Sequence, residues 1–165
     1  MRAVQARRDL VLLGGGHSHA LALRMLAMQP PEATRITLVS DTAFAPYSGM
    51  LPGLVAGHYS LQETHIDLRR FCGPRGIRFI EAEVTGIDLE PGTVQLRDRP
   101  PVAFDALSIN IGARPELDSV PGAREYAVPV KPVSQFSSCS DALVLSPVNA
   151  KGRLYTLLFV SKIDV

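Results

Sequence analysis

The sequence predicts an α/β fold, in which helices cover a mostly parallel β-sheet. Residues 9–13, DLVLL, are a continuous apolar run, which is typical of a strand buried on both faces. A run of glycines, a helical pattern and a second β-branched run at residues 35–40, RITLVS, follow it. The order strand, glycine turn, helix and strand is a βαβ unit, and 165 residues are enough for one compact domain.

The helix of this unit is expected to run from His17 to Gln29, because two prolines follow and stop it. Three apolar residues at helical spacing share one face of it: Leu21, Met25 and Met28. The next stretch, residues 41–60, is rich in glycine, proline and aromatic residues. It therefore predicts a loop with one short helical stretch at residues 50–56.

The later part of the chain predicts a second helix and a small antiparallel β insertion. The helix is expected at residues 66–76, ending at Gly73-Pro74. Strand-like stretches separated by turns lie at residues 77–90, 93–98 and 101–112, with a last strand from Ala106 to Ile111 that only Ser108 and Asn110 interrupt with polar side chains. Residues 137–165 show no clear helical or strand pattern. The expected division is an N-terminal extension at 1–8, one domain at 9–136 and a divergent tail at 137–165.

Composition excludes several classes of function. The 17 basic and 16 acidic residues nearly cancel, so nothing indicates nucleic-acid binding. The two cysteines, Cys72 and Cys139, lack the spacing of a redox dithiol or a zinc site. The first apolar run is too short for a signal or transmembrane segment, so we expect a cytoplasmic protein. The sequence leaves the oligomeric state open.

The glycine turn at residues 14–19, GGGHSH, resembles the G-x-G-x-x-G pattern of dinucleotide-binding folds. Gly14 allows a tight turn, and Gly16 allows the backbone to approach a pyrophosphate. The helix that begins with His17 and Ser18 would point its free N–H groups at the phosphates. His19 occupies the place of the third glycine, where a Cβ is expected to push the helix from the strand unless the imidazole points outward.

The other half of that pattern is an acid at the end of the second strand, which binds a ribose. Ser40 stands where the acid most often falls, and Asp41 follows one residue later. We therefore expect Asp41, in a shifted register, to take this role.

Two other interpretations of these residues remain open. The glycines could form a flexible turn without a ligand. Alternatively, His17 and His19 resemble the H-x-H metal pair of barrel-type hydrolases, with His58 and His65 as further ligands, although such barrels need about 250 residues.

Three separated motifs give the chain a family resemblance: the turn at 14–19, YSGMLPGLVAGHY at 47–59 and FDALSINIGARP at 104–115. Over residues 9–136 the chain resembles the FAD-dependent pyridine nucleotide-disulfide oxidoreductase superfamily. The nearest likeness is to the NADH dehydrogenase-like flavoprotein module fused to selenide, water dikinase, which has the same GGGHSH turn.

The resemblance implies a Rossmann-like FAD/NAD(P)-binding domain and a set of cofactor-binding residues. The pyrophosphate would be held by Gly14, Gly15 and Gly16, and the ribose by Asp41 or Ser40. Residues near the flavin ring would be Pro46, Tyr47, Ser48, Gly49 and Met50, although Met50 and Leu51 could instead be core anchors of a simple turn. A segment that passes close to the FAD would be formed by Gly112, Ala113 and Arg114, with Asn110-Ile111-Gly112 in place of Ala-Thr-Gly.

By this resemblance the chain is the FAD-binding portion of an NAD(P)H oxidoreductase that passes electrons to an acceptor such as a quinone. The sequence lacks the second glycine turn of an NADH domain, so we expect an incomplete module, weakly active or inactive alone. No residue stands out as an acid, base or nucleophile. Two alternatives are a stand-alone NAD(P)-binding dehydrogenase and a non-enzymatic remnant that serves as an interaction module.

Overall fold

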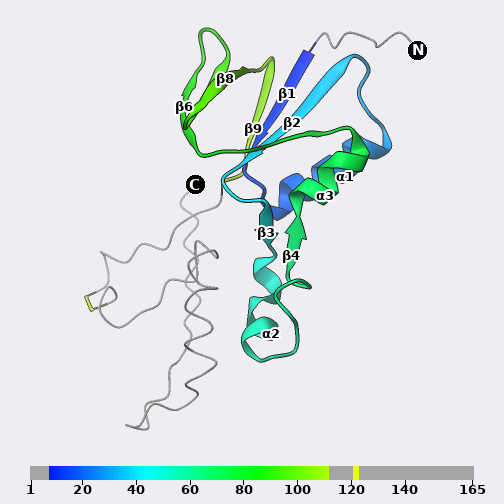
Figure 1. The fold of residues 1–165 in the computed structure, drawn as a ribbon, viewed down its shortest axis with the longest axis vertical. Coiled ribbons are helices and arrows are strands. Elements are labelled where there is room, and N and C mark those ends of the chain that lie inside the picture. The colour runs from blue at the N-terminus through cyan, green and yellow to red at the C-terminus, as the bar shows by residue number, and fades with distance from the viewer. Residues whose placement is uncertain (1–7, 112–120, 123–165) are drawn as a thin grey trace. The chain divides into compact units, whose positions relative to one another are not determined.

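The computed structural model describes residues 8–111 and 121–122, and residues 51–58 belong to a separate compact unit. The centre of the first unit is a four-stranded, all-parallel sheet, coloured from blue to yellow-green in Figure 1. Its strand order is β5-β2-β1-β9. Listed along the chain, these strands are β1 (Arg8–Leu13), β2 (Thr34–Ser40), β5 (Arg78–Glu81) and β9 (Ala106–Ile109). The predicted Rossmann-like α/β class is therefore confirmed.

The predicted βαβ unit is present, with α1 (His17–Met28) joining β1 to β2. The two strands pair in parallel from Arg8 opposite Thr34 to Leu13 opposite Val39. Successive side chains of a strand point to opposite faces of the sheet, so each strand contributes side chains to both faces. Both faces are covered, as the uninterrupted apolar sequence of β1 indicates.

Helices cover one face of the parallel sheet. Leu12 and Leu38 pack there against Leu23 of α1 and against Leu68 and Cys72 of α3 (Leu68–Cys72). Burying a leucine side chain of this kind stabilises the fold by about 2 kcal/mol.

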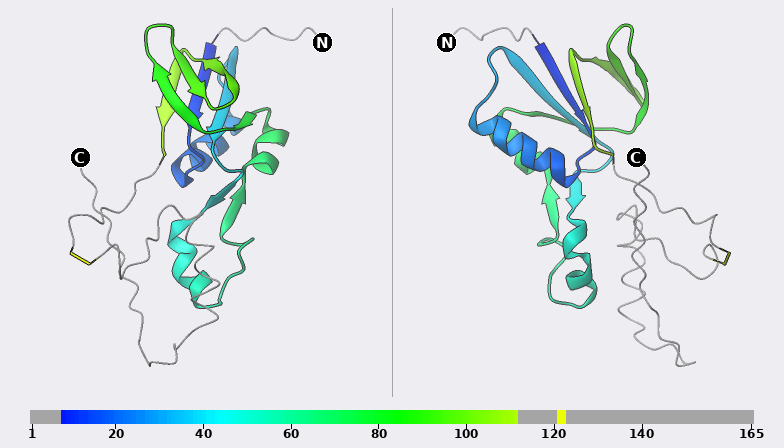
Figure 2. Two further views of the ribbon diagram at one scale, coloured as in Figure 1. Left: turned by 60° about the vertical axis from the view of Figure 1, so that its left-hand side comes forward. Right: turned by 180° about the vertical axis from the view of Figure 1, so that it is seen from behind.

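An antiparallel three-stranded sheet covers the opposite face, as Figure 2 shows from behind. Its strands are β6 (Val84–Asp88), β7 (Thr93–Leu96) and β8 (Arg99–Ala103), in the order β6-β7-β8. Val94 and Leu96 of β7 pack against Val11, Leu13 and Val39 of the parallel sheet. This sheet is the predicted antiparallel insertion.

The structure divides two strand-like stretches of the sequence, and in the second of them the predicted last strand does begin at Ala106. Residues 77–90 become β5 and β6, and residues 101–112 become β8 and β9. The chain changes sheets at each break: the N–H of Ala82 donates to the Ser40 carbonyl, and the N–H of Asp105 donates to the Asp9 carbonyl. A β-branched sequence does not reveal which of two sheets a strand joins, so the break between β5 and β6 was not predictable from it.

The structure shows which face of α1 packs on the sheet. Leu21, Met25 and Met28 do share one face, but they are 50%, 67% and 69% exposed. The face that packs on the sheet contains Leu23, which is fully buried, and Ala20. Leu26 and Ala27 also pack against the cluster that contains Leu23.

The remaining elements of this unit begin after β2. Strand β3 (Phe44–Pro46) pairs with β4 (His65–Asp67) in an antiparallel ribbon, and a 3₁₀ turn, η1 (Ser48–Met50), follows β3. The helix predicted at 66–76 begins only at Leu68, because Asp67 caps it by accepting from the Arg70 N–H at 3.0 Å. It ends at Cys72 and continues as a 3₁₀ turn, η2 (Gly73–Arg75).

In the separate unit, α2 (Leu51–Val55) is the predicted short helical stretch. No helix in the described ranges is both long and apolar enough to cross a membrane. The predicted N-terminal extension, except Arg8, and the predicted tail at 137–165 lie outside the described residues.

Candidate functional site

The candidate site lies where the carboxyl ends of three parallel strands meet. Leu13, the last residue of β1, is opposite Val39 on one side and opposite Ile109 of β9 on the other. The glycine turn, the end of β2 and the segment after β9 therefore lie together. Ligands of open α/β sheets bind outside this edge.

The first glycine of the turn can only be glycine. Gly14 has φ +91°, and its N–H donates to the Val39 carbonyl at 2.7 Å. A Cβ at Gly14 would collide with the backbone carbonyl of Asn110. The turn thus depends on a backbone conformation and a close approach that a side chain would prevent.

The next two glycines keep the backbone accessible between neighbouring side chains. A Cβ on Gly15 would meet the Leu68 side chain and lie 3.0 Å from Ser40 Oγ, and one on Gly16 would lie 2.8 Å from Asn110 Nδ2. Gly16 caps α1 and supplies no side-chain hydrogen bond. Among the described residues, nothing accepts a hydrogen bond from the backbone N–H groups of Gly15 or Gly16.

The start of α1 offers further donors to a ligand. His17 and Ser18, the first two residues of the helix, are exposed, and no acidic residue lies in its first turn. The first N–H groups of a helix have no partner within it and lie at its positive dipole end. An anion such as a diphosphate fits this arrangement.

The structure gives the orientation of the His19 ring, which the sequence left open. The imidazole points inward rather than outward and is only 5% exposed. Its Nδ1 lies 2.7 Å from the Gly14 carbonyl oxygen, and its Nε2 lies 2.9 Å from Ser108 Oγ in β9. The third glycine is thus replaced by a side chain that is bonded to the turn itself.

The residues predicted near a flavin ring lie after β3. Pro46 ends that strand opposite His65, and Tyr47, Ser48 and Gly49 follow and are exposed. The Tyr47 ring stacks on the imidazole of His17, with ring centroids 4.5 Å apart and planes inclined by 21°. The structure therefore brings the 46–49 segment to the start of α1, which the sequence spacing alone does not show.

The two candidates for ribose binding differ in accessibility. Ser40 is 3% exposed, and its hydroxyl oxygen lies 3.5 Å from the N–H of Thr42. Asp41 is exposed and follows the end of β2. An accessible carboxylate is the better hydrogen-bond acceptor for a ribose hydroxyl.

Asn110 belongs to this site although the sequence analysis did not assign it a role. Its N–H donates to the Leu13 carbonyl at 2.8 Å, and its side chain lies beside Gly16. The signal for it was the polar residue in an otherwise apolar strand. The other predicted residues of that segment, Gly112, Ala113 and Arg114, lie outside the described residues.

The histidines do not gather around a common point. Both ring nitrogens of His19 are engaged as described, and Nδ1 of His65 lies 2.8 Å from the Leu61 carbonyl oxygen. No three His, Cys, Asp or Glu side chains within residues 8–111 are placed to hold a metal ion.

Cys72 is a core residue, as expected for an isolated cysteine. It is fully buried in the cluster between the sheet and the helices. Burial raises the pKa of its thiol to about 11, and the charge of Arg75 opposes this shift in part. A thiol with this pKa is not a nucleophile near neutral pH.

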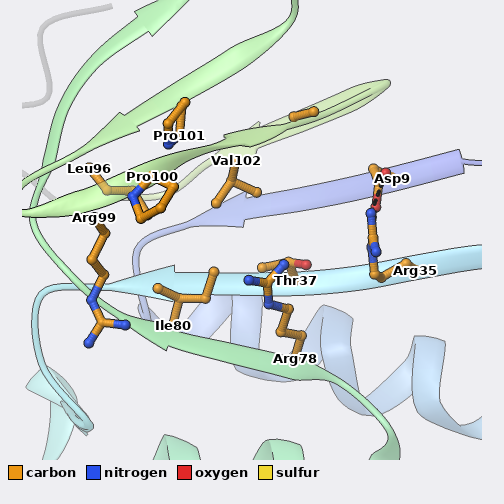
Figure 3. A pocket seen from close by; sticks show the side chains of 11 residues that line it. Asp9, Arg35, Thr37, Arg78, Ile80, Leu96, Arg99, Pro100, Pro101 and Val102 are labelled. Carbon is orange, nitrogen blue, oxygen red and sulfur yellow. Dashed lines mark hydrogen bonds and ion pairs between the residues drawn. The ribbon is translucent and has the colours of Figure 1, made fainter.

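A cavity of about 300 Å³ is lined by residues of the parallel sheet and of β8 (Figure 3). Asp9, Arg35 and Arg78 line it from the parallel sheet, and Asp9 and Arg35 form an ion pair there. No residue of the glycine turn lines it. We therefore place the candidate site at the glycine turn and not in this cavity.

The parallel sheet, the crossover helix and the glycine turn at the carboxyl edge define a Rossmann-type nucleotide-binding fold. No protein-family model matches the chain. Several curated proteins are similar to the chain, including the following two. The demethylphylloquinone reductase NdbB of Synechocystis sp. is 31% identical over 133 residues, which are 74% of this chain and 32% of that protein. The alternative NAD(P)H-ubiquinone oxidoreductase C1 of Arabidopsis thaliana is 27% identical over 139 residues, covering 74% of this chain and 27% of its own length.

A solved structure, the sulfide:quinone oxidoreductase of Aquifex aeolicus, shares the fold. It has a TM-score of 0.65 and 21% identity, and the match covers 85% of this chain and 33% of that one. The chain thus spans about a third of the length of the proteins it matches. The two curated relatives are named as a quinone reductase and an NAD(P)H-quinone oxidoreductase, which supports the resemblance to the pyridine nucleotide-disulfide oxidoreductase superfamily.

Proposed function

We propose that residues 9–136 are the FAD-binding portion of an NAD(P)H oxidoreductase and that the glycine turn holds the FAD diphosphate. The observation that supports this most directly is that, among the described residues, nothing accepts a hydrogen bond from the N–H groups of Gly15 and Gly16 at the carboxyl edge of the sheet. A Cβ on either glycine would meet a neighbouring side chain, that of Leu68 or that of Asn110, so both positions favour glycine. Backbone N–H groups beside a helix start are the usual partners of a pyrophosphate.

The rest of the cofactor would be held by residues on both sides of the turn. Asp41 is the proposed partner of the adenosine ribose. The segment with Tyr47 lies at the start of α1 through the stack with His17 and is the proposed neighbour of the flavin ring. Gly112, Ala113 and Arg114 remain part of this proposal by sequence alone. Bound FAD would supply a ring that accepts hydride.

The proposed electron donor is NAD(P)H, and the proposed acceptor is a quinone. The names of the two curated relatives and of the solved structure support this, because all three name a quinone and one names NAD(P)H. Hydride transfer requires the nicotinamide and flavin rings in one site. The proposed contribution of this chain is to bind and orient the cofactor. Its proposed location is the cytoplasm.

The test is FAD binding by the purified 165-residue chain. We expect added FAD to lose fluorescence on binding and the desalted protein to keep a visible flavin spectrum. Gly16→Val should weaken binding more than about tenfold, because one charge-assisted hydrogen bond contributes about 1.5–3 kcal/mol. Gly86→Val is the matched control, since a Cβ there would lie 3.8 Å from Gln95 Cγ, an ordinary contact.

A colourless protein that does not change the fluorescence of added FAD would refute the proposal. Tighter binding of NAD(P)H than of FAD would instead support a stand-alone NAD(P)-binding domain.

A further inference from the structure

His19 is held on both sides within the described unit. It is 5% exposed, with its Nδ1 at 2.7 Å from the Gly14 carbonyl oxygen and its Nε2 at 2.9 Å from Ser108 Oγ. These two contacts join the turn after β1 to the adjacent strand β9. No buried side-chain polar atom in the described part of the chain lacks a partner, so this pair of bonds satisfies the ring completely.

The partners fix which nitrogen of the ring carries the proton. A carbonyl oxygen can only accept, so Nδ1 of His19 must donate to Gly14. In the neutral ring Nε2 is then an acceptor, and the Ser108 hydroxyl donates to it. The arrangement therefore requires the Nδ1–H tautomer of His19.

This bond also fixes the direction of the next N–H group. In a trans peptide, the carbonyl of one residue and the N–H of the following residue point to opposite sides. Because the Gly14 carbonyl points at the buried His19 ring, the Gly15 N–H points away from it. The same bond keeps a carbonyl oxygen, which would repel an anion, out of the ligand's place.

We propose that His19 is a positioning residue for a diphosphate: it holds the Gly14 carbonyl inward and thereby directs the Gly15 N–H toward the ligand. This inference rests on the proposed function. It specifies that binding of the diphosphate group of the ligand depends on His19. In a G-x-G-x-x-G turn, the third glycine acts by being small. Here the same turn is held by a hydrogen bond, so restoring a small residue at position 19 does not substitute for the imidazole.

Two substitutions separate the two ring contacts. In His19→Asn, the amide nitrogen takes approximately the place of Nδ1 and can still donate to Gly14. In His19→Gln, the amide reaches the place of Nε2 near Ser108 and leaves the Gly14 carbonyl without its donor. Both replacements are polar and of similar size, so they form a matched pair.

The probes are ADP, which carries the diphosphate, and adenosine, which does not. Measured by calorimetry on the full chain, His19→Asn should bind ADP within about threefold of the original protein, and His19→Gln should bind it about tenfold more weakly. Adenosine affinity should be the same in both variants. Equal ADP affinity in the two variants, or equal losses for ADP and adenosine, would overturn the proposal.

Two further measurements apply even if both variants unfold. Ser108→Ala removes only the contact at Nε2 of His19, so the ADP affinity of this variant should stay within about threefold of that of the unmodified protein. The ¹⁵N chemical shifts of the His19 ring in the unmodified protein should show the Nδ1–H tautomer. A proton on Nε2 alone would overturn the inference. If the unmodified chain binds neither ADP nor FAD, the proposed function fails, whereas the tautomer still tests the His19 bond.

Discussion

Gly14→Ala provides a quantitative test of the turn that supports the candidate site. Its φ of +91° costs an L-residue about 1–2 kcal/mol. The new Cβ would also collide with the carbonyl of Asn110. Asn110 cannot move freely because its N–H donates to the Leu13 carbonyl at 2.8 Å. Relieving such a contact costs about 1–3 kcal/mol, so we expect the free energy of unfolding to fall by about 2–5 kcal/mol.

The matched control is Gly76→Ala. Gly76 also has positive φ, +67°, but no described atom lies within 4 Å of a Cβ built on it. It should therefore lose only the conformational part, about 1–2 kcal/mol. The chain has no tryptophan, so urea unfolding is best followed by far-UV circular dichroism. If the two variants lose the same free energy, the close approach of Asn110 to the turn does not constrain position 14, and the geometry argued for the site is wrong.

Two further predictions concern the core. Burial raises the pKa of the Cys72 thiol to about 11 from a value of 9.0 in the free side chain. Between these two pH values the folded protein keeps the thiol proton and the unfolded chain releases it. The free energy of unfolding should therefore fall as the pH rises from about 9 to about 11. Urea titrations at pH 8 and 10.5 should show this fall, and a Cys72→Ala variant that falls equally would exclude Cys72 as the cause. Leu23→Ala should cost about 2–5 kcal/mol and Met25→Ala less than about 0.5 kcal/mol, since the first is fully buried and the second 67% exposed. Similar melting temperatures for the two variants would contradict the assigned faces of α1.

Much of the fold was predictable because its signals are local. The apolar run of β1, the glycines and the β-branched run of β2 each lie within a few residues, and together they specify the βαβ unit. The face of α1 was not predictable in the same way. Leu21, Met25 and Met28 and the packed Leu23 are all apolar, so the pattern does not identify which side packs on the sheet.

The candidate site was predicted in its parts rather than in its assembly. The first three glycines and the end of β2 follow from the motif and its spacing. The stack of Tyr47 on His17 and the approach of Asn110 to Gly16 join residues that are distant in sequence. These contacts depend on the order β2-β1-β9 of the strands, which no local pattern determines.

The polar side chains of β9 and of the residue after it lie beside the candidate site. Strand β9 is at the edge of the parallel sheet and its residues are exposed or half-buried, so its polar side chains can make contacts with the neighbouring turn. In β9 and the residue after it, Ser108 contacts the His19 ring and Asn110 lies beside Gly16. Both partners belong to the turn on the neighbouring strand. His19 and Ser108 are 89 positions apart in the sequence, and their contact joins β9 to the glycine turn, because the other nitrogen of the His19 ring is bonded to the Gly14 carbonyl.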